Sequence, residues 1–387
     1  MRVAVVMPRG CSMSADKPNS METVARTLAE SSRWKGSLKI ICDEGSNPVP
    51  HLDLMTVPAD LGRKARTEAV ARAIEAFDPE IIEYHQQLGP AEALARRCPH
   101  RIHVLHRHTR IKPPSNRIER LRYRHRLAAF DRLIFVSTAA EREFAADYPT
   151  LAERASVIFN PLDMADWHQP VGKRDRLIMF SGRAMADKGL DTFCGSLARV
   201  LDERQDWRGA LLLADWDRHA DWASPHIEAL SRFGDRIEIH TSAEMELVRS
   251  VTRRAAIAVT PSRVAEALGL TALEAHAAGA ALISSGRGGL AEASGDHALY
   301  CDPDDVAGMA EAMRSLVDQP QLRLRMTRAA QARVQKVYAP GLWSSRLDDL
   351  RDGLVDRTMT IGPGRPPSWH QVMTRMFAGP REPRVAS

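Results

Sequence analysis

The chain has 387 residues, 44% of them hydrophobic and 5% aromatic, and carries 54 lysines and arginines against 49 acidic residues. This length and apolar content allow two aliphatic cores of ordinary domain size. No apolar stretch approaches the roughly 20 residues that a membrane-spanning helix needs. The five cysteines are odd in number and lack C-x-x-C spacing, which favours reduced thiols over a disulfide framework or a zinc site. Because the chain opens on a strand-like run, MRVAVVMP, without a signal peptide, we expect a cytoplasmic location.

Short apolar runs alternate with amphipathic stretches along the whole chain, which is typical of parallel sheets with helices on both faces. In the first half we expect strands at residues 2–8, 38–42, 55–58, 81–85, 102–106, 133–137 and 157–160. In the second half we expect strands at residues 176–180, 211–214, 237–240, 256–260, 281–285 and 299–302. Either Asn19 or Ser20 should cap the first helix. The predicted fold class is α/β, with two doubly wound domains and a ligand cleft between them.

We expect the chain to have four parts. These are an N-terminal domain at residues 1–165, a C-terminal domain at 166–340, a helix at 341–357 and a basic tail at 358–387. We expect the hinge at residues 161–175, which contain two prolines and a glycine. The helix at 341–357 has three apolar residues at helical spacing that could form its docking face: Trp343, Leu347 and Leu350. The tail also has three apolar residues on one helical face, Trp369, Met373 and Phe377. This face could dock on a membrane or on the protein itself, and we expect the protein.

Two glutamates eight residues apart stand in the run PSRVAEALGLTALEAHAAG, residues 261–279. A strand-like run precedes it, and Gly279 ends a helix whose apolar stripe Glu274 shares, whereas Glu266 lies in the loop before that helix. A carboxylate on an inward stripe is costly to bury without donors, so Glu274 should bind hydroxyl groups. Gly269 would let an anion approach the first backbone N–H groups of the helix. The alternative is that Glu274 is an ordinary residue of an amphipathic helix and Glu266 a solvated loop charge.

A second anion site is predicted upstream, in the run RLIMFSGRAMADKGLDTFCGSLARVL. Arg183 and Lys188 lie in the turn between a strand and a helix, close to the amino end of that helix. Acidic residues usually occupy such positions, so two cations there indicate a bound anion such as phosphate. The alternative is again a pair of solvated loop charges.

These segments together resemble the retaining family 4 glycosyltransferases of GT-B fold, the glycosyl transferases group 1. The resemblance is carried by SGRAMADKG, PSRVAEALGLTALEAHAAG, ALISSGRGGLAE and VIFNPLDMADW. It implies two Rossmann-like domains that face each other across a cleft. The first would bind the acceptor, the second would bind the nucleotide sugar, and the last helix would cross back to the first domain.

The resemblance also implies roles for individual residues. Arg183 and Lys188 would grip the donor diphosphate, Glu266 would contact the donor sugar, and Glu274 would bind the ribose. The loop residues Leu268, Gly269, Leu270 and Thr271 would complete the donor site, with backbone N–H groups that stabilise the leaving diphosphate. Neither a protein nucleophile nor a metal or other cofactor would be required.

Histidines cluster near the end of the strand predicted at residues 102–106. The run VLHRHTR resembles the strand end at which the family carries an active-site histidine, and this would be His108, with His106 as the rival. A metal site at the HxxHxH spacing is the alternative. We do not expect one, because no acidic or cysteine ligand accompanies these histidines in the sequence.

The residues from Arg96 to Arg126 include eleven lysines and arginines but one acidic residue, Glu119. Such a run could bind anionic lipid headgroups at a membrane surface, or an acceptor with phosphate or uronate groups. It could also be a solvated face. Nucleic acid is not expected as a partner, because no nucleic-acid motif accompanies the run.

The sequence therefore predicts a hexosyltransferase that moves a sugar from a UDP- or GDP-sugar to a saccharide or glycolipid acceptor. We expect its pathway to be cell-envelope polysaccharide or lipopolysaccharide synthesis, at the cytoplasmic face of the membrane. The alternatives are a non-catalytic protein that binds sugar nucleotides and a GT-B epimerase.

Overall fold

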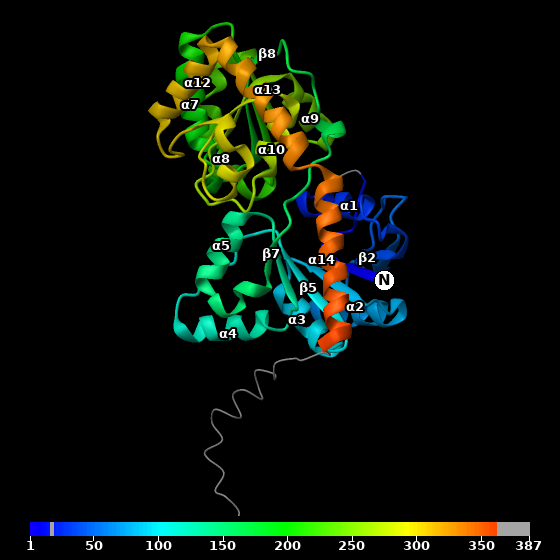
Figure 1. Ribbon diagram of the computed structural model, residues 1–387. Helices are drawn as coiled ribbons and strands as arrows, with labels where there is room; N and C mark the ends of the chain where they lie inside the picture. Colours follow the sequence, from blue (N-terminus) through cyan, green and yellow to red (C-terminus); the bar gives the residue numbers. More distant parts are fainter. Residues whose placement is uncertain (16–18, 362–387) are drawn as a thin grey trace, which may run out of the picture.

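The apolar runs of the first half form a seven-stranded parallel sheet in the computed structural model, which describes residues 1–15 and 19–361 (Figure 1). Its order is β3-β2-β1-β4-β5-β6-β7. The strands are β1 (Val3–Val6), β2 (Leu38–Asp43), β3 (Leu54–Val57), β4 (Ile81–His85), β5 (Ile102–Arg107), β6 (Arg132–Phe135) and β7 (Ala155–Val157). The helices between them are α1 (Ser20–Glu30), α2 (Arg63–Phe77), α3 (Leu88–Arg97), α4 (Arg117–Leu127) and α5 (Thr138–Asp147). All four residues of β1 are buried, as expected for a central strand covered on both faces.

The second half forms a six-stranded parallel sheet of order β10-β9-β8-β11-β12-β13. Its strands are β8 (Asp175–Arg183), β9 (Arg208–Ala214), β10 (Ile237–Thr241), β11 (Ala255–Thr260), β12 (Ala281–Ser284) and β13 (Ala298–Tyr300). Its helices are α6 (Met164–Trp167), α7 (Leu190–Glu203), α8 (Trp216–Glu228), α9 (Met245–Arg254), α10 (Leu270–Ala278), α11 (Gly289–Ser294), α12 (Val306–Asp318) and α13 (Pro320–Val337). The last helix, α14 (Pro340–Ile361), leaves this domain.

The predicted α/β fold class of two Rossmann-like domains is confirmed. Asn19 caps α1 as predicted, in a capping box with Glu22. Several strand boundaries differ from the prediction, three of them by three residues: the end of β7, the end of β8 and the start of β9. β7 ends at Val157, where the predicted strand begins, although the Ile158 N–H beyond it still donates to the Phe135 carbonyl of β6 at 3.0 Å. β8 runs beyond residue 180 to Arg183, because it stays paired with β9 that far.

The two domains contact each other directly at the amino end of α5. The Glu292 carboxylate on α11 accepts hydrogen bonds from the backbone N–H groups of Thr138 and Ala139, both at 3.1 Å. These are orphan donors of the first turn of α5, and a carboxylate at that end also interacts favourably with the helix dipole. A residue of the second domain therefore helps to cap a helix of the first.

Helix α14 runs along the first domain, where it packs against α1 and β5 (Figure 1). The three apolar residues at helical spacing, Trp343, Leu347 and Leu350, pack in one cluster with Val24 and Leu28 of α1. The last helix thus covers the first domain although it follows the second in the sequence. The domain limits given above stay predictions.

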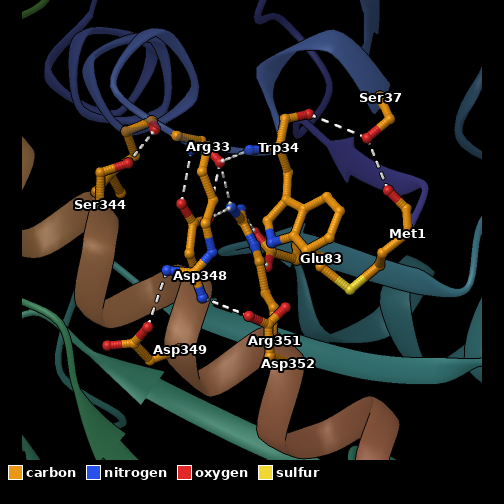
Figure 2. A network of polar contacts seen from close by, with 12 residues as sticks. Met1, Arg33, Trp34, Ser37, Glu83, Ser344, Asp348, Asp349, Arg351 and Asp352 are labelled. Atoms are coloured by element: carbon orange, nitrogen blue, oxygen red, sulfur yellow. Dashed lines mark hydrogen bonds and ion pairs between the residues drawn. The ribbon is translucent and has the colours of Figure 1, made fainter.

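A buried polar network also joins α14 to the first domain (Figure 2). Arg351 donates to both carboxylate oxygens of Glu83 on β4, at 2.7 and 2.8 Å, and to Asp348 at 2.7 Å. Asp348 also accepts a 2.7 Å bond from the Ser32 hydroxyl. Arg351, Glu83 and Asp348 are each 1% exposed. Burial alone would raise the pKa of Glu83, but Arg351 and His106 lower it well below its ordinary value.

Among the described residues, no helix combines the length and the apolar character that crossing a membrane requires. The apolar face predicted for the tail, formed by Trp369, Met373 and Phe377, lies outside the described residues.

Candidate active site

A cleft of about 660 Å³ lies between the two domains. One wall is formed by α1 of the first domain and by the segment around α6 that joins the domains. The other is formed by residues at the carboxyl ends of β8, β9 and β11 and by α9 and α10. Ligands of open α/β sheets bind beyond the carboxyl ends of the strands, so this cleft is where chemistry is expected.

Six of the predicted site residues line this cleft: Arg183, Lys188, Glu266, Leu270, Thr271 and Glu274. Leu268 and Gly269 are not part of the described lining. Leu268 is 1% exposed and packs into the core below the loop. Gly269 begins α10 with a φ of 96°, and a Cβ there would lie 2.4 Å from a methyl group of Leu290. Both residues thus fix the conformation of the loop without being part of the described cleft lining.

Arg183 and Lys188 reach the cleft from one turn at the carboxyl end of β8. Arg183 is the last residue of β8, is exposed, and makes no ion pair within the described residues. Lys188 ends a short 3₁₀ helix, and Gly189 follows with a φ of 69°. A Cβ on Gly189 would lie 2.2 Å from the carbonyl oxygen of Pro261, so only glycine lets this turn approach the Pro261 loop.

Glu266 pairs directly with Lys188, so the candidate for the donor sugar and a candidate for the diphosphate neutralise each other in the free protein. The Ser262 hydroxyl donates to the same carboxylate oxygen of Glu266 at 2.7 Å. The backbone of Glu266 is fixed as well, because its N–H donates to the Arg287 carbonyl and its carbonyl accepts from the Gly289 N–H. This side chain is therefore held in place before any ligand binds.

Glu274 lies on α10 and faces the cleft, as its position on the inward stripe predicted. It is partly buried, and its carboxylate has no hydrogen-bond or ion-pair partner among the described residues. Burial raises the pKa of Glu274 to about 7, and the nearby Arg249 opposes this only in part. A carboxylate that lacks donors in a cleft is suited to accept hydrogen bonds from ligand hydroxyl groups.

The histidines lie beside one another but away from the described lining of the cleft. Nδ1 of His85 lies 2.8 Å from Nε2 of His108, and the two rings stack with centroids 4.9 Å apart. Burial, together with His106 and Arg107, lowers the pKa of His108 to about 3, so its ring is neutral at physiological pH. Neither His108 nor His106 is brought to the donor site, and their catalytic role stays a prediction.

Glu83, His85 and His106 place their potential ligand atoms within 4.8 Å of one another, all of them buried. An acidic group therefore does accompany the histidines in space, contrary to what the sequence suggested. However, both carboxylate oxygens of Glu83 already accept hydrogen bonds from Arg351. A guanidinium at that position would repel a metal ion, so the cluster does not fit a metal centre.

Sequence reasoning missed Arg249, a third cation on the cleft. It lies on α9, donates to Asp166 of α6 at 2.7 Å, and is close enough to Glu274 to influence its pKa. A signal was present, because Met245, Val248 and Arg249 follow helical spacing on one stripe. The helical periodicity that puts Glu274 on an inward stripe puts Arg249 on one too.

The basic run from Arg96 to Arg126 divides into a paired part and an unpaired part. The arginines paired with acidic side chains are Arg96, Arg97, Arg101, Arg110 and Arg126. Exposed arginines without an ion pair in the described residues lie on α4: Arg117, Arg120, Arg122 and Arg124. The free positive charge is thus concentrated on one helix of the first domain, and this helix does not line the cleft.

Comparison with known proteins finds a matching family model for each half of the chain. The model described as Glycosyl transferases group 1 matches residues 175–319, and the model described as Glycosyltransferase Family 4 matches residues 24–166. The glycogen synthase of Mycobacterium tuberculosis is 36% identical over 216 residues, which are 53% of this chain and 50% of that protein. The D-inositol 3-phosphate glycosyltransferase of Streptomyces avermitilis is 30% identical over 225 residues, 53% of this chain and 48% of that protein. The chain spans about half the length of these curated relatives.

Solved structures share the fold over nearly the whole chain. A glycosyltransferase from Rickettsia africae superposes with a TM-score of 0.75 at 14% identity, and covers 92% of this chain and 98% of its own. HepE from Anabaena, in complex with UDP and glucose, gives a TM-score of 0.74 at 14% identity, with 91% and 100% covered. With both halves matched by family models and the GT-B fold in common, this chain belongs to the group 1, family 4 glycosyltransferases.

Proposed function

We propose that this protein is a retaining hexosyltransferase that transfers a sugar from a UDP- or GDP-sugar to a saccharide or glycolipid acceptor. The proposal rests on one observation: a single interdomain cleft is lined by the Lys188–Glu266 pair and by Arg183 and Glu274, whose side chains pair with none of the described residues. This set offers cations for a diphosphate and carboxylates for hydroxyl groups. The HepE structure, which holds UDP and glucose in a protein of the same fold, supports a uridine donor.

In this mechanism the bond between the anomeric carbon and the diphosphate oxygen breaks. The acceptor oxygen bonds to the same carbon from the same face, so the configuration is retained. Arg183, Lys188 and the first backbone N–H groups of α10 stabilise the charge that grows on the departing diphosphate. That phosphate takes the proton of the acceptor hydroxyl. Glu266 holds the hydroxyl groups of the sugar and thereby orients its reactive carbon.

The acceptor is proposed to be an anionic saccharide or glycolipid used in building the cell envelope. The exposed arginines of α4 support this, because they offer positive charge that the described acidic residues leave unpaired. The same helix would attract the protein to an anionic membrane surface. The M. tuberculosis relative is named for glycogen and the Streptomyces relative for inositol phosphate. Their names are consistent with an acceptor that carries hydroxyl groups, either a polymer or a small molecule.

Release of free nucleotide from a panel of UDP- and GDP-sugars tests this function, with and without a membrane lipid and glycan extract. We expect one donor to release its nucleoside diphosphate only when the extract is present, with label transferred to the extract. Binding of the nucleotide sugar without release would identify a non-catalytic binding protein. Conversion of the sugar without any acceptor would identify an epimerase.

Nucleotide binding should weaken as the pH falls through 7, because Glu274 would then lose the charge that accepts the ribose hydroxyl groups. The folded-state pKa of this acid is raised to about 7, so the carboxylate form is present above that value and absent below it. Calorimetric titration with UDP or GDP between about pH 6 and pH 8 measures the effect. Glu274→Gln should bind more weakly at pH 8 and show a flatter pH profile, since the remaining slope belongs to the phosphate itself. An unchanged slope in this variant would remove Glu274 from ribose binding.

A further inference from the structure

Arg263 belongs to the loop that carries Glu266 and bonds across to the turn that carries Lys188, yet it is not part of the described lining of the cleft. Its side chain is 24% exposed and uses all of its N–H groups within the protein. One fork donates to the two carboxylate oxygens of Asp191, at 2.7 and 2.9 Å. The remaining bonds go to the Ala186 carbonyl at 2.6 Å, the Thr192 hydroxyl at 2.9 Å and the Asp304 carboxylate at 2.5 Å.

These contacts fasten the Lys188 turn on both sides of the lysine. Ala186 precedes Lys188, and Asp191 and Thr192 follow it at the start of α7. The backbone N–H of Arg263 adds a 2.8 Å bond to the Asp187 carbonyl. The turn is therefore held from its entry to its exit by one residue of the other loop.

The same residue is fixed on the Glu266 side. It directly follows Ser262, whose hydroxyl donates to the Glu266 carboxylate at 2.7 Å and also lies 3.3 Å from the Asp187 carbonyl. The carbonyl of Arg263 accepts a 2.8 Å bond from Arg287. The contacts of Arg263 thus determine how far apart the amine of Lys188 and the carboxylate of Glu266 stand.

We propose that Arg263 is a positioning residue that locks the Lys188 turn to the Glu266 loop and so sets the geometry of the donor site. Lysine cannot replace it, because a single ammonium lacks the planar fork that holds Asp191 while also reaching Ala186 and Asp304. This inference rests on the proposed transferase function for its kinetic consequence. Its structural consequence does not depend on any activity.

Hydrogen exchange of the backbone amides tests the lock directly. Arg263→Lys should speed exchange in residues 185–192 and 262–268 by roughly tenfold, and leave the core strands of the same domain unchanged. Asp191→Asn should produce the same pattern, since it removes the other half of the fork. Arg314→Lys is the matched control, because Arg314 bonds Glu311 and Glu203 on the outside of the domain. Unchanged exchange in both loops of Arg263→Lys would overturn the proposal.

Steady-state kinetics with the donor that the wild-type protein uses provide the second readout. Displacing Lys188 by about 1 Å should lower kcat by roughly 10- to 100-fold, while KM for the donor changes less than about threefold. A kcat equal to that of Arg314→Lys, despite faster loop exchange, would overturn the positioning role. If the wild-type protein turns over no donor, the proposed function fails. The exchange experiment alone then decides whether Arg263 holds the Lys188 turn to the Glu266 loop.

Discussion

Replacing Lys188 or Glu266 with alanine is expected to lower the rate of sugar transfer by roughly two to three orders of magnitude while the fold stays intact. Lys188 would stabilise charge that develops on the leaving diphosphate, an interaction that is strongest in the transition state. Glu266 would hold the sugar so that its anomeric carbon meets the acceptor. Both side chains are about one-fifth exposed, so their loss leaves no large cavity in the core.

The ion pair between these two residues separates their effects on binding. In the free protein Lys188 is held by Glu266, and a diphosphate must compete for it. Glu266→Gln should therefore bind nucleoside diphosphate at least as tightly as the wild-type protein while it loses turnover. Lys188→Ala should weaken that binding, because one of the phosphate contacts is gone.

Initial rates of transfer and calorimetric titrations of the same variants measure both effects. Lys173→Ala and Glu311→Gln remove like charges from exposed positions outside the cleft and should behave as the wild-type protein does. Near-normal turnover in Lys188→Ala or Glu266→Ala would contradict the assignment of the donor site.

Replacing Arg351 with methionine should lower the free energy of unfolding by about 3–5 kcal/mol. The substitution leaves Glu83 and Asp348 without their cation at positions that are 1% exposed, where an unpaired carboxylate is strongly unfavourable. Helix α14 would lose its polar attachment to β4 as well. Urea unfolding followed by circular dichroism measures the change.

Arg33→Ala is the matched control, because Arg33 pairs with Asp349 and Asp352 on the same helix but at the surface. Exposed pairs of this kind contribute about 0–1 kcal/mol. The combined variant Glu83→Leu with Arg351→Met should recover part of the loss, since it removes a buried charge together with its partner. A loss below about 1 kcal/mol in Arg351→Met would show that the network does not anchor α14.

The stability contributed by Glu83 should also depend on pH in a defined direction. Its pKa in the folded protein is lowered below the ordinary glutamate value, so its contribution is complete above that ordinary value. It is lost as the pH falls towards the folded-state pKa. Acid unfolding should therefore begin at a higher pH in Arg351→Met than in the wild-type protein.

The strands could be predicted because central parallel strands are buried on both faces and read as continuous apolar runs. Glu274 could be placed for a related reason, since a carboxylate on an inward helical stripe has few structural explanations. Arg183 and Lys188 were found because cations are unusual at the amino end of a helix. In each case a pattern within one short segment was enough to predict the position of the strand or side chain.

Contacts between distant segments were not predictable in this way. The pairing of Lys188 with Glu266 depends on a turn and a loop that approach through Gly189, and no spacing in the sequence encodes it. His85 meets His106 because β4 and β5 pair in that register. The location of His108 away from the cleft follows from the same packing, which a motif at a strand end cannot show.

Arg183 and Lys188 are proposed to form a diphosphate site in the interdomain cleft, and calorimetric titration with UDP, GDP, UMP and GMP tests this claim. We predict one-to-one binding in which a diphosphate binds roughly tenfold or more tightly than its monophosphate. Arg183→Ala should remove most of that difference, with the protein still folded. Absence of binding by either diphosphate, or an undiminished preference in Arg183→Ala, would contradict the claim.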